Sequence, residues 1–400
     1  MNVIYIGSSR PESTTDELIK LGSRVNFAGN TLQNALLEGF SKLCPKFKVI
    51  SAWTTTTYPK VKKLLFPRRY FELNGSTTDN YVCVGSLNLP IINLLSKYLR
   101  TKKQLKRMLD KNDDNAVIIY EVHTPFLLAA TSLRKKIKHI NVIVPDLPEF
   151  MSGNVGKLHK LLKSIDHVII TRCLKKVDSY SLLSEGMQER LPIEGKAWTL
   201  MEGIFQKEEY EEPVEKASEK VIMYTGNIFK RRGVDLLLNA FQLIDKPEYR
   251  LWIRGNGDLK DEIIARSKQD SRIVYFEPMS LTELRKMERK ATVMVNTTPP
   301  SMDFTKYFFP SKTMEYLASG TVTVMFRLEC MPEEYDSYIY YVEEESVDAL
   351  KDKLLEVCEK SREELLAFGQ NAREFILTKK TPVAQCQKVI DLFTNYNKVR

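Results

Sequence analysis

The chain alternates short apolar runs with longer stretches in which apolar residues recur every three or four positions. Continuous runs such as VIIY at 117–120 are typical of parallel strands buried on both faces, whereas the longer spacing is typical of amphipathic helices. In the first half the predicted strands are residues 3–7, 48–52, 81–85, 116–120, 140–144, 167–171 and 180–183, with helices at 30–44 and 91–109. This alternation predicts an α/β fold on a parallel sheet.

The same alternation begins again at residue 220. The predicted strands there are residues 221–225, 249–254, 272–276, 292–296, 321–326 and 338–342, with helices at 233–244, 258–268, 280–289 and 310–317. Between the two halves, residues 206–219 read QKEEYEEPVEKASE, an acidic, proline-containing segment typical of a linker. We therefore predict two Rossmann-like, doubly wound domains, residues 1–205 and 206–381, that face a cleft.

Composition excludes several classes of protein. No apolar run in the 400 residues approaches the roughly 18 needed to span a bilayer. The start, MNVIYIG, has no basic n-region and is interpreted as a first strand rather than a signal peptide. The six cysteines are scattered and form no C-x-x-C pair, and there are four histidines, so reduced core thiols are favoured over disulfides or a metal site. Walker loops, nucleophile elbows and HExxH motifs are absent.

The net charge of +9 is unevenly distributed. Residues 1–200 carry 30 basic and 17 acidic side chains, whereas residues 201–400 carry 30 and 34, so the halves have charges of +13 and −4. Such asymmetry indicates an anionic partner for the first half, either nucleic acid or a membrane surface, unless the basic groups are only solvated.

The segment DFTKYFFPSKTMEYLASG, residues 303–320, is the richest in candidate chemistry. Pro310 suits a first helical position, and the free N–H groups of the first turn, from Ser311 onward, favour an anion. Lys312 adds a positive charge there. Glu315 offers a carboxylate that can accept two hydroxyl hydrogen bonds, as a ribose diol requires. The alternative is an ordinary capped helix, which does not by itself account for Lys312 and Glu315.

A second candidate is YTGNIFKRRGVD, residues 224–235, which is read as a strand, a basic turn and the start of a helix. Gly226, followed by Asn227, lets a ligand approach the backbone closely. The turn holds three consecutive basic side chains, including Arg231 and Arg232, which would suit a diphosphate. A solvated basic turn is the alternative.

The first half offers weaker candidates at the ends of its predicted strands. His123 follows one strand, where it could contact a substrate or fill a structural role. Gly29 and Asn30 are expected to place backbone amides at a helix start. Asp146 and Glu149 offer carboxylates, one of which could act as a base toward an acceptor hydroxyl, although helix caps are an alternative.

Taken in order, these segments resemble a GT-B glycosyltransferase of the large retaining family 4, and especially the bacterial enzymes of capsular and exopolysaccharide assembly. The resemblance covers residues 220–345 well, through YTGNIFKRRGVD, LWIRGNGD, FPSKTMEYLASG and PEEYDSYIYYVEEE. It is looser in the first half, where it rests on strand order, the glycine loop and the His-x-Pro sequence. The resemblance also implies that a last helix, within residues 382–400, crosses back to complete the first domain.

Carried over from that family, Glu315 would hold the donor ribose, and Arg231 and Lys312 would neutralise the donor diphosphate. Gly226 would pack against the phosphate, and His123 would meet the transferred sugar. The second domain would bind a nucleotide diphosphate sugar and the first a lipid-linked glycan acceptor. No metal or other cofactor is implied, because helix ends and cations stabilise the leaving group.

One position departs from the family pattern. Many members have a further glutamate eight positions before the one matched by Glu315, where it contacts the donor sugar; this chain has Tyr307. The donor sugar is therefore not assigned.

The basic surplus of the first half is interpreted as a surface for anionic lipid, which would place the protein in the cytoplasm on the inner face of the cell membrane. Leucines interleave with the second of three basic clusters, as in helices that lie on membranes. The clusters are Lys60, Lys62, Lys63, Arg68 and Arg69; Lys97, Arg100, Lys102, Lys103, Lys106 and Arg107; and Arg134, Lys135, Lys136 and Lys138.

Two other functions are open to the same residues. A nucleotide-sugar epimerase of the same architecture would need acid and base groups around the sugar and no acceptor. A nucleic-acid-binding protein would use the basic half, but that half has no interleaved aromatic platform and no RRM, KH or helix-turn-helix pattern.

Overall fold

The computed structural model describes residues 1–73, 76–147, 157–206 and 214–395. It divides the chain into two compact units. Unit 1 comprises Met1–Ile204 with Pro382–Arg400, and unit 2 comprises Phe205–Thr381. The boundaries predicted from the sequence follow residues 205 and 381.

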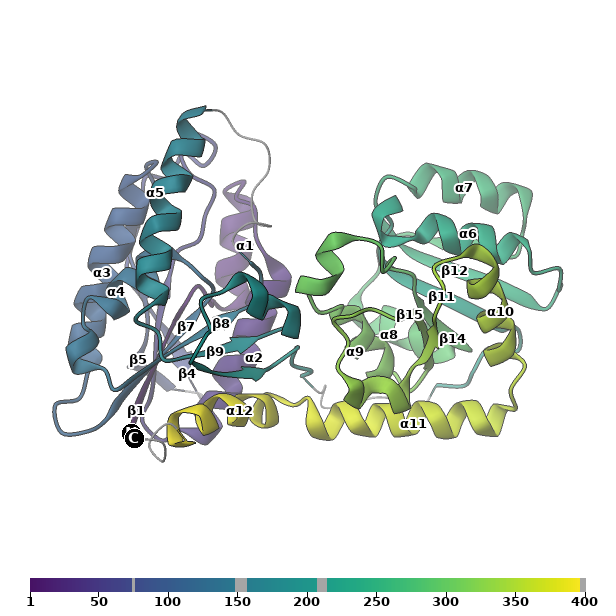
Figure 1. Ribbon diagram of the computed structural model, residues 1–400. Helices are drawn as coiled ribbons and strands as arrows, with labels where there is room; N and C mark the ends of the chain where they lie inside the picture. Colours follow the sequence, from purple (N-terminus) through teal and green to yellow (C-terminus); the bar gives the residue numbers. More distant parts are fainter. Residues whose placement is uncertain (74–75, 148–156, 207–213, 396–400) are drawn as a thin grey trace. The chain divides into compact units, whose positions relative to one another are not determined.

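Within its described residues, unit 1 is built on an eight-stranded sheet in the order β10-β9-β8-β7-β1-β2-β5-β4 (Figure 1). Neighbouring strands are parallel except for β4 and β5, which pair antiparallel. The strands are β1 Asn2–Gly7, β2 Phe47–Ala52, β4 Arg69–Leu73, β5 Ser76–Val84, β7 Asn115–Tyr120, β8 His139–Val144, β9 Ser179–Leu182 and β10 Ala197–Leu200, with a small separate ladder of β3 Leu65–Phe66 and β6 Ser86–Leu87.

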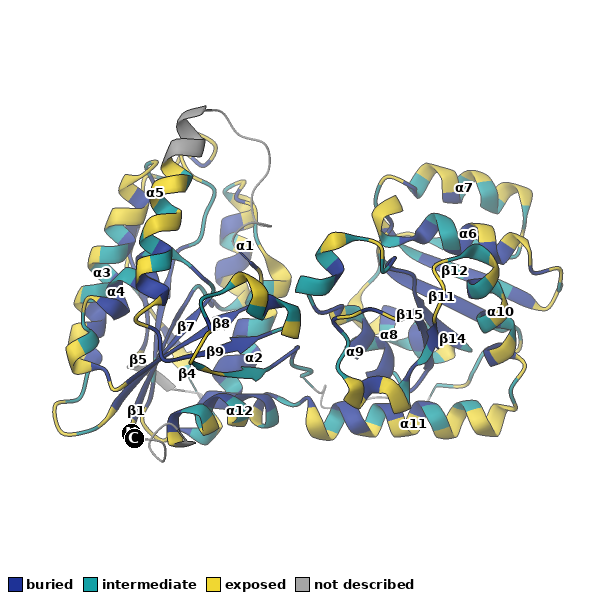
Figure 2. Ribbon diagram, in the orientation of Figure 1, coloured by how far each residue is buried: buried dark blue, intermediate teal, exposed yellow. Residues whose placement is uncertain are grey.

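Helices cover both faces of this sheet, because its central strands are apolar on both sides (Figure 2). Tyr5 and Val49 belong to the core that includes Phe40 of α2 and Val389 of α12. The opposite face is covered by α3 and α4. The helices are α1 Glu12–Lys20, α2 Phe27–Leu43, α3 Ile92–Met108, α4 Thr124–Thr131, α5 Lys157–Leu174 and α12 Pro382–Asn395.

Two sequence-based elements in unit 1 are corrected. Residues 167–171, predicted as a strand, lie inside α5, because the apolar run HVIIT continues a helical pattern that packs on α4. The helix predicted at 30–44 begins at Phe27, because the Asn26 side chain caps it and accepts a hydrogen bond from the Gly29 N–H at 2.9 Å.

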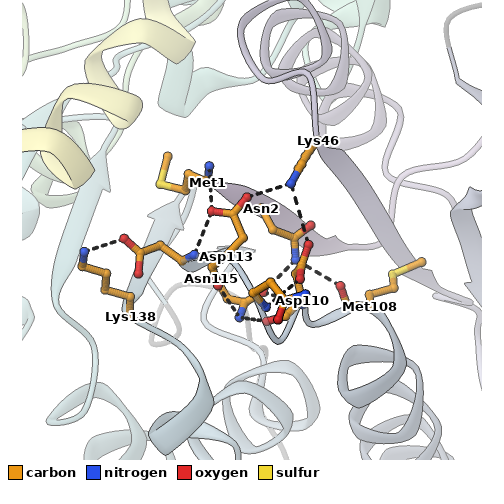
Figure 3. Close-up of polar contacts among 10 residues, drawn as sticks. Met1, Asn2, Lys46, Met108, Asp110, Asp113, Asn115 and Lys138 are labelled. Carbon is orange, nitrogen blue, oxygen red and sulfur yellow. Dashed lines mark hydrogen bonds and ion pairs between the residues drawn. The ribbon is translucent and has the colours of Figure 1, made fainter.

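A polar network joins the amino ends of the central strands of unit 1 (Figure 3). The Met1 amino group lies 3.0 Å from Asp113 Oδ1, and Lys46 Nζ lies 3.0 Å from Asp113 Oδ2. Hydrogen bonds from these two cations lower the pKa of Asp113 to about 2, and the bond from Lys46 has the larger effect. Asn2 Nδ2 also donates to Asn115 Oδ1 at 2.7 Å. Polar groups at this edge are thus engaged with one another, whereas ligands of such sheets bind at the opposite, carboxyl edge.

In the described part of unit 2, a six-stranded parallel sheet has the order β13-β12-β11-β14-β15-β16 (Figure 1). Ile222 and Ile253 face the core shared with α6, α7 and α10, whereas Val221 and Met223 face α8 and α9. The sheet is therefore doubly wound, as the sequence predicts. The elements are β11 Lys220–Asn227, α6 Val234–Gln242, β12 Tyr249–Asn256, α7 Lys260–Gln269, β13 Ile273–Phe276, α8 Leu281–Lys290, β14 Val293–Asn296, α9 Ser311–Ala318, β15 Val322–Phe326, β16 Tyr340–Val342, α10 Val347–Cys358 and α11 Arg362–Lys379.

All six cysteines are free and buried, in agreement with the expected core thiols. Among the helices of the described ranges, none has the length and apolar character needed to cross a bilayer.

Candidate functional site

The candidate site of unit 2 lies where its strand order reverses. β11 has β12 on one side and β14 on the other, so the chain leaves β11 in one direction and later returns to its other edge. Ligands of doubly wound sheets bind at the carboxyl ends of the two strands flanking such a point. The candidate site of unit 2 is therefore formed by the loops that follow β11 and β14 and by the start of α9.

A tight basic turn follows β11. Gly226 has φ of +141° and Gly233 has φ of +69°, a region of backbone space that favours glycine. A Cβ on Gly233 would lie 2.0 Å from the carbonyl oxygen of Thr297, just past β14. The Thr297 hydroxyl in turn donates to the Arg232 carbonyl at 2.9 Å. The basic turn, a 3-10 helix at Lys230–Arg232, is thus held against the end of the neighbouring strand.

The two predicted phosphate-binding arginines differ in their surroundings. The Arg232 guanidinium is half-buried and lies over the rings of Phe304 and Phe308, at 5.2 and 5.4 Å from their centroids. Arg231 is exposed and lies 5.2 Å from the ring of Phe229. Burial, and then the charge of Arg231, lower the pKa of Arg232. Among the residues that the structure describes, neither arginine has a carboxylate partner.

The start of α9 is less open than the sequence suggests. The Ser311 N–H donates to Phe309 O at 2.9 Å and the Thr313 N–H donates to Pro310 O at 2.8 Å, so these amides are not free. The sequence predicts free N–H groups in the first turn of α9. This prediction is wrong for Ser311 and Thr313, because their N–H groups donate to backbone carbonyl oxygens that precede them. Lys312 Nζ lies 2.6 Å from Glu315 Oε2, and each side chain is 37% exposed. The two residues assigned to the diphosphate and the ribose are thus neighbours on one accessible face.

Two residues that were not predicted from the sequence, Tyr316 of α9 and Glu288 of α8, fix these helices to β11. The Tyr316 hydroxyl donates to Thr225 O at 2.6 Å and accepts from Thr225 N at 3.1 Å. Glu288 of α8 is buried and accepts from the Thr225 hydroxyl at 3.1 Å. Burial, and then the charge of Glu315, raise the pKa of Glu288 to about 7. Because α8 is rich in charged residues, nothing in its sequence distinguished Glu288 from its exposed neighbours.

The remaining candidates belong to unit 1. His123 is the N-cap residue of α4, with its ring against Phe126 at 4.7 Å between centroids. Burial, and then the nearby Lys97, lower the pKa of His123 to about 3, so its imidazole is neutral at neutral pH. Asp146 is exposed at the end of β8, and Glu149 lies outside the described residues.

Gly29 and Asn30 do not offer free amides. Because α2 begins at Phe27, the Gly29 N–H caps onto Asn26 Oδ1 and the Asn30 N–H donates to Asn26 O at 3.1 Å. The Asn30 side chain holds the Arg10 backbone instead, accepting from its N–H at 3.0 Å and donating to its carbonyl at 3.1 Å.

The architecture is shared with solved structures. Sucrose-phosphate synthase from Thermosynechococcus elongatus aligns with a TM-score of 0.63 at 12% identity, over 100% of both chains. The lipopolysaccharide outer core galactosyltransferase WaaB aligns with a TM-score of 0.63 at 14% identity, over 99% of this chain and 100% of that one. The pneumococcal O-GlcNAc transferase GtfA, in complex with UDP and GlcNAc, aligns at 0.54 and 12% identity, over 98% of both chains. No curated protein sequence matches the chain.

The fold is therefore that of the GT-B glycosyltransferases. Residues 219–360 match the family described as glycosyl transferases group 1, and this segment contains the basic turn, α8 and α9. Over this segment the chain is similar to glycosyltransferases of this group, and the match and the fold together indicate a glycosyltransferase.

Proposed function

We propose that the enzyme transfers a sugar from a nucleotide diphosphate sugar to a hydroxyl of a lipid-linked glycan, with retention of anomeric configuration, in polysaccharide assembly of the capsular or exopolysaccharide type. Unit 2 binds the donor and unit 1 binds the acceptor. The galactosyltransferase named above acts on lipopolysaccharide, and the O-GlcNAc transferase binds UDP, which supports a nucleotide diphosphate donor and a glycan product.

In this proposal the donor lies at the carboxyl ends of β11 and β14. Glu315 accepts the ribose hydroxyls, while Arg232, Arg231 and Lys312 neutralise the diphosphate. The strand end at Gly226 and Asn227 allows the phosphates to approach the backbone, and Pro310 and Ser311 form the start of α9 beside them. His123 contacts the transferred sugar as a neutral imidazole, because its pKa is lowered to about 3.

These cations also account for the chemistry of the leaving group. Charge develops on the departing nucleoside diphosphate as the glycosidic bond breaks, and fixed positive groups stabilise that charge without reorganisation. Side chains thereby supply what a divalent cation supplies in other transferases, and the proposal includes no metal.

The observation that carries the donor assignment is the Arg232 guanidinium. It is half-buried and held at the switch point, yet it has no carboxylate partner among the described residues. A desolvated cation is costly unless an anion accompanies it, so the position favours an anionic ligand.

Product analysis tests the reaction class. The protein is incubated with UDP-, GDP- and ADP-sugars, with and without oligosaccharide acceptors, and the products are identified by NMR. We expect one donor to yield its nucleoside diphosphate and a glycoside, or slowly the free sugar, with the anomeric configuration retained. A product that is only an epimer of the starting sugar would favour the epimerase alternative and contradict transfer.

A surface of unit 1 supports the proposal of a membrane-bound acceptor. On α3 and just before it, Ile91, Leu95 and Leu99 have exposed fractions of 65%, 56% and 53%, and the β3–β6 ladder adds Leu65 at 55%. Exposed basic residues of the same helix include Lys103. Apolar side chains beside cations favour an anionic lipid surface.

The structure changes which residues form this surface. Lys97 and Leu105, which the sequence analysis placed among its basic and leucine positions, are buried. They are on the face of α3 that packs on the sheet and cannot contact a membrane.

Co-sedimentation with vesicles tests the membrane proposal. We expect the protein to pellet with phosphatidylglycerol vesicles at low salt and to be released at high salt. Changing both Leu95 and Leu99 to serine should reduce the bound fraction at least threefold, whereas Leu243→Ser, at an equally exposed position of unit 2, should not. Equal binding to neutral phosphatidylcholine, or no effect of the leucine changes, would contradict it.

A further inference from the structure

A cavity of about 690 Å³ lies in unit 2, at the edge of its sheet opposite the donor site. The amino ends of three parallel strands form one wall, because Lys220 begins β11, Thr292 directly precedes β14 and Val322 begins β15. Residues 215–219 form a second wall, and the connection from α10 to α11 forms a third. Pockets that bind small molecules commonly have volumes of this order, and the whole lining belongs to unit 2.

Lys216 contributes a half-buried cation to this cavity. Its ammonium donates to Ala291 O at 2.7 Å and to Thr321 Oγ1 at 2.8 Å, which leaves one of its three N–H groups for another acceptor. Both partners are neutral. Burial, and then the charge of Arg362, lower the pKa of Lys216 to about 8. The surroundings therefore disfavour this charge, and an anion beside it would stabilise it.

A second cation, Arg362, begins α11 and lines the same cavity. In the described part of the chain, neither Arg362 nor Lys216 forms an ion pair with a carboxylate. The carboxylates of the lining, Glu215 and Glu219, form no ion pair with described residues either. The cavity thus has two mutually repelling cations whose charges the described residues leave uncompensated.

The other two cations of the lining have partners of their own. Lys220 Nζ lies 2.5 Å from Glu359 Oε2, and Lys360 Nζ lies 5.6 Å from the centre of the Tyr340 ring. These contacts leave the first two cations as the anchor for an anion.

An apolar surface lies beside this anchor. Val322 and Cys358 are buried, whereas Leu365 is half-buried and Leu366 is 38% exposed. The two leucines follow Arg362 by three and four positions, so all three side chains share one face of α11. Cations beside exposed apolar carbon suit a ligand that has both an anionic and an apolar part.

We propose that this cavity binds an organic phosphate monoester, whose phosphate pairs with Lys216 and Arg362 and whose organic part covers Leu365 and Leu366. A phosphate monoester carries nearly two negative charges at neutral pH, so it compensates both cations, whereas a carboxylate compensates one. The planar guanidinium of arginine also matches phosphate oxygens in pairs. Inorganic phosphate would satisfy the cations but leave the leucines in water.

Ligand-observed NMR titration with hexyl phosphate tests the proposal. Wild-type protein is compared with Lys216→Met, Arg362→Gln and the control Lys268→Met, which removes an exposed cation of α7. We expect Kd to rise about tenfold in Lys216→Met, because a half-buried charge-assisted hydrogen bond is lost. The rise should be about threefold in Arg362→Gln, where the lost charge is exposed. The control should bind as wild type.

Three further probes define the class of ligand. Hexanoate lacks the second charge, hexanol lacks both charges, and inorganic phosphate lacks the apolar part. Each should bind wild type more weakly than hexyl phosphate. No binding of hexyl phosphate to wild type, equal binding of hexanoate or hexanol, or a Kd unchanged in both variants would overturn the proposal.

The folding of Lys216→Met needs a check, because this change removes hydrogen bonds to Ala291 and Thr321. If circular dichroism shows that this variant is unfolded, Arg362→Gln carries the test, since it alters an exposed side chain that has no hydrogen bond or ion pair within the described chain.

Competition by UDP, GDP and ADP separates this cavity from the donor site. We expect none of the three to displace hexyl phosphate. Displacement would place the phosphate at the donor site and overturn the cavity assignment, while supporting the proposed function. Binding of hexyl phosphate that depends on Arg362, without binding of any of the nucleotides, would support the cavity assignment and contradict the donor assignment.

Discussion

Arg232→Ala is expected to lower kcat/KM for the nucleotide sugar about 100-fold, whereas Arg231→Ala lowers it less than tenfold. The Arg232 guanidinium is desolvated over Phe304 and Phe308, and its backbone is tied to Thr297, so it is already in place for a diphosphate. Arg231 is exposed, and a charge in water contributes less. A 100-fold loss corresponds to about 2.7 kcal/mol of transition-state stabilisation, which is typical of a preorganised donor.

Steady-state kinetics with the preferred donor give this comparison directly. Arg232→Lys serves as a second variant, because it keeps the charge and loses the planar fork, and it should recover part of the rate. Equal losses in Arg231→Ala and Arg232→Ala would show that the turn contributes only net charge. A larger loss in Arg231→Ala would place the diphosphate on the exposed side of the turn.

Much of the fold is predictable from the sequence, because buried parallel strands have continuous apolar runs. The central parallel strands of both sheets and the second set of elements follow from that pattern, whereas the edge strands β4 and β10 were not predicted. Residues 167–171 show its limit: a short apolar run fits a buried strand or one face of a helix equally well. Residues 167–171 are helical because they continue α5, which begins at Lys157.

The donor site was predictable where its residues are close in sequence. Lys312 and Glu315 are three positions apart on one helix, and their proximity follows from helical geometry. Glu288 and Thr225 are 63 positions apart, and only the fold brings them together. The burial of Lys97 could likewise not be predicted from the sequence, because a basic residue among leucines can lie on either face of a helix.

Glu315→Gln is expected to weaken binding of the nucleoside diphosphate at least tenfold. The amide keeps one acceptor oxygen but loses the charge and the second acceptor, so a ribose diol loses a charge-assisted hydrogen bond. Lys312, freed from its pair at 2.6 Å, remains available to phosphate. The loss should therefore be specific to the ribose. Glu248→Gln, an exposed glutamate before the amino end of β12, is the matched control and should bind as wild type.

The central claim is that unit 2 binds the donor through Glu315 and the basic turn. Calorimetry tests it most directly. The preferred nucleoside diphosphate and inorganic diphosphate are each titrated into wild-type, Glu315→Gln and Glu248→Gln protein. The account predicts one nucleotide site in wild type and in Glu248→Gln, with Kd raised at least tenfold by Glu315→Gln and the affinity for inorganic diphosphate not weakened. Nucleotide affinity that is unchanged in Glu315→Gln, or absent from wild type for UDP, GDP and ADP alike, would contradict it.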